Sequence, residues 1–219
     1  AGREVHLLPI EAPGKLAETA REAVRRAREV DVVVVAAGGD GTINGVVQEV
    51  LGSGCTFGVL PRGTFNYFAR THGIPADLDG ALRVLLEEQA APVQVGLLNE
   101  RVFNVNASLG LYSQSLEDRE VWKQQFGRSR LIAAGAVLAT ILRGHRSLGL
   151  TIELHGQPRH VRTPTVFVGN NALQMEQVGL PEAQAIDRGE LAGVMLKPVG
   201  RWGLLKLLVR GAMGKLAEA

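Results

Sequence analysis

The stretch that decides the fold is VDVVVVAAGGDGTINGVVQEVLG, residues 30–52. It opens with a β-branched run without polar alternation, which is typical of a strand covered on both faces of a parallel sheet. Two glycines, an aspartate, a third glycine and a threonine interrupt the run, and a helical pattern closed by Gly52 follows. A simple turn with Asp40 or Thr42 capping the helix would not need three glycines as well. The stretch therefore predicts a loop that a ligand approaches closely.

This loop has the features of a phosphate site. Open α/β sheets bind ligands beyond the carboxyl ends of their strands, and a helix N-terminus adds N–H groups and a dipole that favour anions. Gly38, Gly39 and Gly41 are expected to adopt positive φ values and to bring backbone N–H groups close to a phosphate. Thr42 and Asn44 are predicted to donate hydrogen bonds to phosphate oxygens or to the nucleotide.

Asp40 is the unusual member of the loop, because a bare carboxylate repels phosphate. It fits the site if Mg²⁺ lies between the carboxylate and the phosphates, or if it orients a proton-bearing group. Asp40 is therefore the predicted metal ligand and catalytic residue.

A second loop repeats this arrangement in GVLPRGTFNYFAR, residues 58–70. A strand ends at a proline, and Gly63, Thr64 and Asn66 precede a short helix. Glycine-threonine loops at the ends of successive strands are expected to form two walls of one crevice.

The first 92 residues alternate strand and helix patterns, which predicts a right-handed, mostly parallel sheet. After residue 92 the pattern is rich in strands, so we predict an α/β nucleotide-binding domain over 1–92 and a strand-rich, β-sandwich-like domain with helices over 93–219. Strands are expected at 3–10, 30–37 and 55–61, a first hairpin turning at 99–100, and a second turning at 156–157. Helices are expected at 14–30, 43–52, 77–89, 115–126, 129–145 and 201–219, with Asp77 or Asp79 capping the third.

The composition limits which classes of function and which cellular compartment are expected. The chain has 219 residues and a formal net charge of +2, so a general nucleic-acid binder is not indicated. Its single cysteine, Cys55, forms no internal disulfide, and no histidine has a cysteine at zinc-ligand spacing. The chain starts without an initiator methionine, so it is expected to begin inside a longer protein. No secretory signal is visible, and the single cysteine fits a reducing compartment. These features favour a cytoplasmic protein.

The longest apolar helical candidate, Leu131–Leu142, is about half of the roughly 20 residues that cross a bilayer. No transmembrane segment is therefore predicted. Residues 127–146 and 201–215 combine apolar centres with flanking or striped cations, which suits interfacial helices at a membrane surface. The alternative is that both helices pack on the second domain or at the contact of a homodimer.

GGDGT at 38–42 and LPRGTFNYFA at 60–69 resemble the catalytic domain of the diacylglycerol kinase, sphingosine kinase and bacterial lipid kinase family. The resemblance continues at FNVNASLGLY (103–112), VFVGNNAL (166–173) and LPEAQAIDRGEL (180–191). It implies ATP- and Mg²⁺-dependent phosphorylation of a lipid hydroxyl. By this analogy residues 38–44, together with Gly63 and Thr64, bind ATP.

Four departures from the family pattern stand out. The strand with an Asn-Pro and glycine loop that usually opens the domain is not visible, and the Asp-Gly-Glu segment that supplies the expected general base would follow Ala219. Arg188 replaces the aspartate expected to bind an accessory metal, although Asp187 is adjacent. Arg62 and Tyr67 stand where apolar and acidic or histidine residues are more usual, and Arg62 is either a phosphate ligand or a solvated loop residue.

Two other classes of function stay open. GGDG also occurs in NAD kinases and phosphofructokinases, so a soluble NAD-kinase-like phosphotransferase is one alternative. The other is a nonenzymatic nucleotide- or lipid-binding module, which the absence of an assigned general base keeps in view. The sequence does not identify the acceptor lipid.

Overall fold

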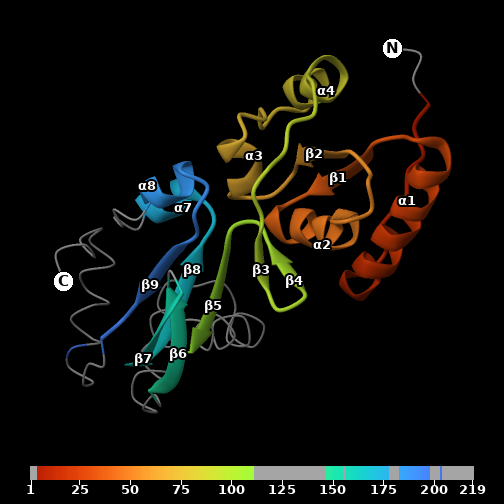
Figure 1. Cartoon of the computed structure of the whole chain (residues 1–219). Helices are drawn as coiled ribbons and strands as arrows, with labels where there is room; N and C mark the ends of the chain where they lie inside the picture. The colour runs from red at the N-terminus through yellow and green to blue at the C-terminus, as the bar shows by residue number, and fades with distance from the viewer. Residues whose placement is uncertain (1–3, 111–146, 155, 178–182, 198–202, 204–219) are drawn as a thin grey trace, which may run out of the picture. The chain divides into compact units, whose positions relative to one another are not determined.

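A computed structural model describes residues 4–110, 147–154, 156–177, 183–197 and 203 (Figure 1). The chain divides into two compact units, Ala1–Val105 and Asn106–Ala219, which we describe separately. This division comes after a hairpin at residues 96–103, whereas the boundary predicted near residue 92 comes before it and stays a prediction.

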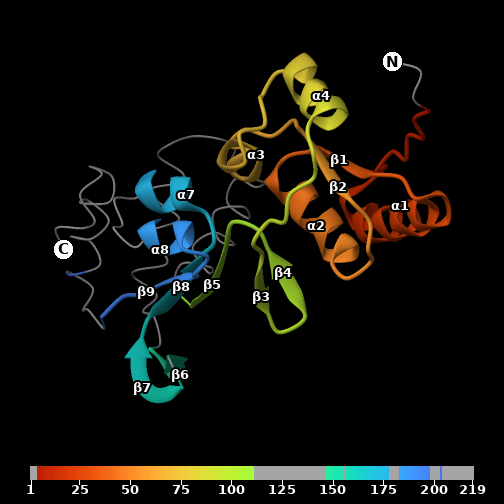
Figure 2. The same ribbon diagram turned by 45° about the horizontal axis from the view of Figure 1, so that its top comes forward.

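The first unit is built on a parallel pair of strands, β1 and β2, paired in register from Val34↔Phe57 to Gly38↔Pro61. Helices α1 and α2 pack on each other beside this pair, and α4 packs on β2 (Figures 1 and 2). The elements in chain order are η1 (Pro13–Lys15), α1 (Leu16–Val30), β1 (Val34–Gly38), α2 (Asp40–Val50), β2 (Phe57–Pro61), α3 (Tyr67–Thr71), α4 (Leu78–Glu87), β3 (Gly96–Leu98) and β4 (Arg101–Phe103).

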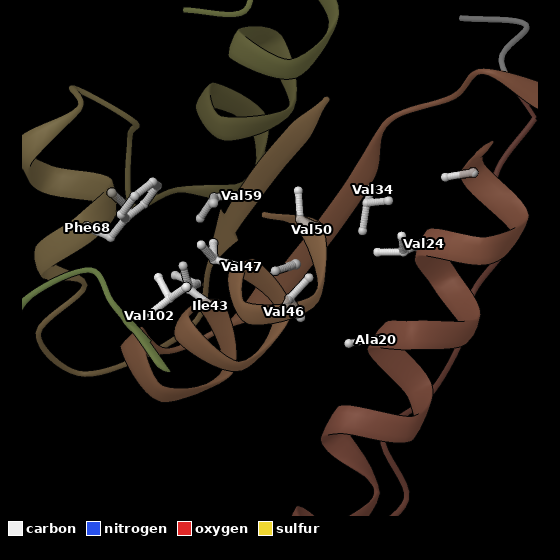
Figure 3. Packing of buried hydrophobic residues seen from close by; sticks show 13 residues of the cluster. Ala20, Val24, Val34, Ile43, Val46, Val47, Val50, Val59, Phe68 and Val102 are labelled. Carbon is white, nitrogen blue, oxygen red and sulfur yellow. The ribbon is translucent and has the colours of Figure 1, made fainter. Parts of the chain in front are cut away.

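The core of this unit lies around α2, whose apolar residues recur at helical spacing at Ile43, Val46, Val47 and Val50. These side chains meet residues of α1, β1, β2, α3 and β4 in one cluster (Figure 3). Ile43 is completely buried. Each fully buried aliphatic side chain stabilises the fold by about 1.5–3 kcal/mol, so the core fixes α2 firmly against the strands.

The strand predicted at residues 3–10 is wrong for the part that the structure describes. Residues 4–10 have no strand geometry, and Val5 and Leu7 are 73% and 85% exposed. The expectation that both faces of the next strand are covered is also wrong, because Val33 and Val35 are 46% and 42% exposed. Among the described residues β1 pairs only with β2, and a lone apolar segment gains no strand geometry without a neighbour that pairs its backbone groups.

The end of α2, the start of α4 and the first hairpin turn lie where the sequence predicted them. Asp77 caps α4 by accepting the N–H of Gly80 at 2.7 Å, which settles the choice between Asp77 and Asp79. Gly52 has φ of 75° just beyond α2. Asn99 has φ of 55° in the turn between β3 and β4, at the predicted hairpin position.

The second unit contains an antiparallel sheet in the order β5–β8–β9 and a separate hairpin of β6 and β7. Met175 is completely buried and packs with Ala183 and Ala192. Thr163, also buried, places its hydroxyl 2.6 Å from the Thr165 carbonyl oxygen and 2.8 Å from that of Leu196. The described elements are β5 (Asn106–Gly110), β6 (Leu148–Leu154), β7 (Gln157–Thr163), β8 (Thr165–Gly169), α7 (Ala172–Gln177), α8 (Ala183–Asp187) and β9 (Ala192–Met195).

The predicted fold class, an α/β part followed by a strand-rich part, is confirmed. The helices predicted at 115–126 and 129–145 lie outside the described residues, as does the one at 201–219 apart from Gly203. In the described part of the chain no helix is both long and apolar enough to cross a bilayer.

Candidate functional site

The first glycine loop joins the end of β1 directly to α2. Gly38 is the last residue of the strand, Gly39 is the N-cap with extended backbone, and the helix begins at Asp40. The N-cap Gly39 has no side chain that could accept the N–H groups at this helix start, in contrast to Asp77 at the start of α4, and no other residue in the described part of the chain forms a side-chain cap there. The first N–H groups of an 11-residue helix therefore face outward without a side-chain cap, which favours an anion.

Close packing requires a glycine at Gly38 and Gly39, and positive φ requires one at none of the three loop positions, which corrects the sequence expectation. None of Gly38, Gly39 and Gly41 has a positive φ. A Cβ on Gly38 would lie 2.5 Å from the Cβ of Thr42, so the threonine packs directly over that glycine. A Cβ on Gly41 would meet nothing within 4 Å, so neither packing nor backbone geometry within the described residues requires a glycine there.

The second glycine loop touches the first one. Pro61 pairs with Gly38 at the end of the sheet, and the N–H of Arg62 donates to the Gly38 carbonyl at 2.9 Å. A Cβ on Gly63 would lie only 2.6 Å from the Cα of Gly39. The two backbones can approach this closely only because both residues lack a side chain, so the predicted two walls do lie together.

Asn66 holds the second loop in shape. It is only 9% exposed and adopts the left-handed conformation, with φ of 50°. Its Oδ1 accepts the N–H of Gly63 at 2.8 Å, and its Nδ2 donates to the Gly63 carbonyl at 3.0 Å. Both amide atoms are thus engaged within the loop, while Thr64 beside it is exposed.

Asp40 connects the two loops. Its Oδ1 accepts the N–H of Phe68 at 3.1 Å, so the carboxylate of the first loop sits at the N-terminal turn of α3. A carboxylate at a helix start is favoured by the helix dipole. Asp40 therefore caps α3, whereas the sequence analysis considered capping only for the helix that follows the first loop and set it aside.

Asn44 faces the β3–β4 hairpin. Its Nδ2 donates to the Val102 carbonyl at 3.0 Å, and its Oδ1 accepts the N–H of Asn104 at 2.9 Å. Gln48, one turn further along α2, accepts the Val102 N–H and donates to the Glu100 carbonyl. The sequence analysis missed Gln48, although two amides four residues apart on one helix indicate a shared polar partner.

The sequence profile of the diacylglycerol kinase catalytic domain family matches residues 1–98. These residues, 98 of the chain's 219, are similar to that family. A diacylglycerol kinase of Staphylococcus aureus (strain JH9) is 40% identical over 101 residues, which cover 45% of this chain and 32% of the relative. The match to this diacylglycerol kinase therefore spans about a third of its length.

Solved structures of diacylglycerol kinases are also similar to the chain. One from Bacillus anthracis str. Sterne matches with a TM-score of 0.54 at 24% identity and covers 77% of this chain and 54% of that one. A second from the same strain, provisionally assigned to the same enzyme class, has a TM-score of 0.57 at 27% identity, with coverages of 77% and 56%. The diacylglycerol kinase fold therefore extends beyond residue 98.

The segment with Asp187 and Arg188 forms the end of helix α8. Gly189 has φ of 78°, and the N–H groups of residues 188–190 bond back to the last turn of α8. Arg188 donates to the Gln184 carbonyl and forms an ion pair with Glu190 at 3.1 Å. Within the described residues no group of three or more His, Cys, Asp or Glu could hold a metal ion.

Proposed function

We propose that the first unit binds the triphosphate of ATP where the two glycine loops meet, and that the protein transfers the γ-phosphoryl group to a lipid hydroxyl. The observation that carries the proposal is the uncapped N-terminus of α2 at the carboxyl end of a parallel strand pair, with Gly63 packed against Gly39. The similarity of this region to diacylglycerol kinases supports the lipid as acceptor.

Gly41 provides independent support. Glycine destabilises a helix by about 1 kcal/mol relative to alanine, and neither positive φ nor crowding offsets this at Gly41. A bound group that needs the space of a side chain explains the residue. In the proposed complex the phosphates lie against Gly41, and the N–H groups of Asp40, Gly41 and Thr42 donate to their oxygens.

The remaining predicted site residues divide into two roles in this proposal. Gly38, Gly39, Gly63 and Thr64 line the phosphates, with Thr64 exposed and able to donate its hydroxyl. Asn44 and Asn66 act mainly as braces, since both atoms of each amide are already engaged with backbone groups.

Asp40 is the residue proposed to hold Mg²⁺, directly or through a water molecule. Mg²⁺ is usually bound by one or two carboxylates together with substrate phosphates and water, so a single carboxylate beside a phosphate site fits this ion. When bound, Mg²⁺ would neutralise charge on the phosphates. Because phosphoryl transfer depends mainly on placement and charge neutralisation, the rigid loop pair would contribute by fixing the γ-phosphate for the attacking hydroxyl.

The acceptor comes from a bilayer in this proposal, so the protein would work at a membrane surface on the cytoplasmic side. We also keep the homodimer of the sequence analysis as a prediction. The alternatives are an aqueous acceptor, as in an NAD-kinase-like enzyme, and a module that binds nucleotide or lipid without catalysis.

The test uses the protein with γ-labelled ATP, Mg²⁺ and mixed-lipid vesicles, and counts label after organic extraction. Asp40→Asn is the matched variant, because its amide oxygen still accepts the Phe68 N–H while the charge is lost. Label in the organic phase that disappears with this variant supports a lipid kinase. Label confined to the aqueous phase supports the soluble phosphotransferase. Nucleotide binding without transfer supports the binding module.

A further inference from the structure

We propose that residues 62–73 form a docking segment for an anionic lipid surface, with Phe65 entering the headgroup layer and Arg62 and Arg70 contacting the anionic groups. The inference extends the proposed function, because a kinase for a membrane lipid has to bring its phosphate site to the bilayer. Its test nevertheless measures membrane binding and needs no catalysis.

The aromatic part of the segment is rigid and faces solvent. Phe65 is 61% exposed, and its ring stacks on Tyr67 with centroids 5.5 Å apart and planes 9° apart. Asn66 between them is buried and tied twice to Gly63, so the backbone holds the phenylalanine outward. A single exposed apolar residue is ordinary, but one braced in this way loses little conformational entropy when it inserts.

The charges of the segment point to an anionic partner. Residues 62–73 contain Arg62, Arg70 and His72 and no acidic residue. Both arginines are exposed, and neither forms an ion pair with any other residue that the structure describes. The described arginines that do form ion pairs lie elsewhere, namely Arg21, Arg25, Arg26 and Arg188.

Asp40 is an acidic residue that contacts the segment. Its carboxylate is half-buried, and one oxygen accepts the N–H of Phe68, so this charge is turned toward the helix start. Basic residues next to an exposed aromatic ring are the combination that binds the interface of anionic bilayers. The same segment carries Gly63 and Thr64, so docking would place the proposed phosphate site at the level of the headgroups.

The decisive measurement is co-sedimentation of the full chain with two kinds of vesicle, phosphatidylcholine alone and equal parts of phosphatidylcholine and phosphatidylglycerol. The parent should prefer the anionic vesicles. Phe65→Ala, Arg62→Gln and Arg70→Gln should each weaken that binding roughly fivefold, because one cation near such a surface contributes about 1 kcal/mol and burial of most of one phenyl ring at least as much. Added salt should reduce the difference between the arginine variants and the parent.

Matched controls come from the same unit. Leu97→Ala removes a 57% exposed apolar side chain from β3, and Arg83→Gln removes an exposed cation from α4. Both should bind anionic vesicles like the parent. Phe65→Trp adds a direct reporter, whose emission, after subtraction of the parent spectrum, should shift to the blue with anionic vesicles.

Three outcomes would overturn the proposal. The parent could fail to prefer anionic vesicles, or the segment variants could bind them as well as the controls do, which would assign membrane binding to other parts of the chain. Alternatively, Phe65→Ala could raise the Kd for ATP and leave vesicle binding unchanged, which would make the ring a stacking surface for the nucleobase. If the parent protein binds anionic vesicles through this segment but transfers no phosphoryl group, the proposed function is wrong and the docking proposal is supported.

Discussion

Replacing Gly41 and Gly63 in turn by alanine separates the glycine that serves a ligand from the one that serves the fold. At Gly41 the new Cβ meets nothing within 4 Å, whereas at Gly63 it would lie 2.6 Å from the Cα of Gly39 and 2.8 Å from Oδ1 of Asn66. The first change should therefore affect binding and spare stability. The second should reduce stability.

The structure sets the magnitudes. Gly63→Ala forces two backbones apart, and such overpacking destabilises a protein by about 1–3 kcal/mol, or roughly 2–12 °C in Tm for a chain of this size. Gly41→Ala improves helix propensity by up to about 1 kcal/mol. Its Tm should therefore be at least that of the parent, and at most about 2–4 °C higher. The methyl group would obstruct about one charge-assisted hydrogen bond to phosphate, which raises the Kd for ATP roughly 10- to 150-fold.

The assay pairs thermal unfolding by circular dichroism with calorimetric titration of ATP. Gly14→Ala is the control, because a Cβ there also meets nothing within 4 Å while the residue lies in η1, before α1. This control should match the parent in ATP affinity.

Unchanged ATP affinity in Gly41→Ala would refute the reasoning, because it would mean that no phosphate approaches the start of α2. An unchanged Tm in Gly63→Ala would equally show that the two loops are not in close contact.

Three further changes test individual contacts in the two units. Asn44→Ala should lower the free energy of unfolding in urea by about 1–3 kcal/mol, because the Val102 carbonyl and the Asn104 N–H lose their partner, and it should affect the Kd for ATP less than Gly41→Ala does. Thr163→Val should cost about 1–3 kcal/mol in the same assay, because the buried hydroxyl also accepts the Thr165 N–H, whereas Thr151→Val on the exposed hairpin should cost less. Burial against Phe68 lowers the pKa of His72, so a proton NMR titration should place it below the ordinary 6.5. Between the lowered pKa and pH 6.5 the unfolded chain binds more protons than the folded one. The free energy of unfolding should therefore be independent of His72 above pH 6.5 and should decrease as the pH falls toward the lowered pKa. The variant His72→Phe should not show this pH dependence.

Local patterns in the sequence were enough to predict most elements. The helices α1, α2 and α4 follow from apolar residues at helical spacing, and the turns at Asn99 and Gly156 follow from residues that tolerate a positive φ. The two glycine loops were predicted to form two walls of one crevice because parallel strands end at one edge of a sheet, and the register of Gly38 with Pro61 shows that the loops lie side by side.

What the sequence could not provide depends on contacts between distant residues. The partner of Asp40 is Phe68, and that of Asn44 is the hairpin at residues 102–104, so neither hydrogen bond is visible in a local pattern. A position requires glycine either because a neighbouring atom packs too closely for a Cβ or because the backbone has a positive φ. The sequence alone does not distinguish these two reasons, whereas the backbone geometry does. Residues 4–10 have the apolar content of a strand, but strand formation depends on a neighbour as well.

The hydrogen bond between Asn44 and the N–H of Asn104 links the start of α2 to the end of the first unit. The chain enters the second unit at Asn106, the first residue of β5, so Val105 alone separates the last anchored residue of the first unit from the first strand of the second. Helix α2 starts at the proposed phosphate site and, one turn later, holds the β3–β4 hairpin and Asn104 through the amide of Asn44. A ligand that stabilises the start of α2 would therefore also protect this hairpin against local unfolding.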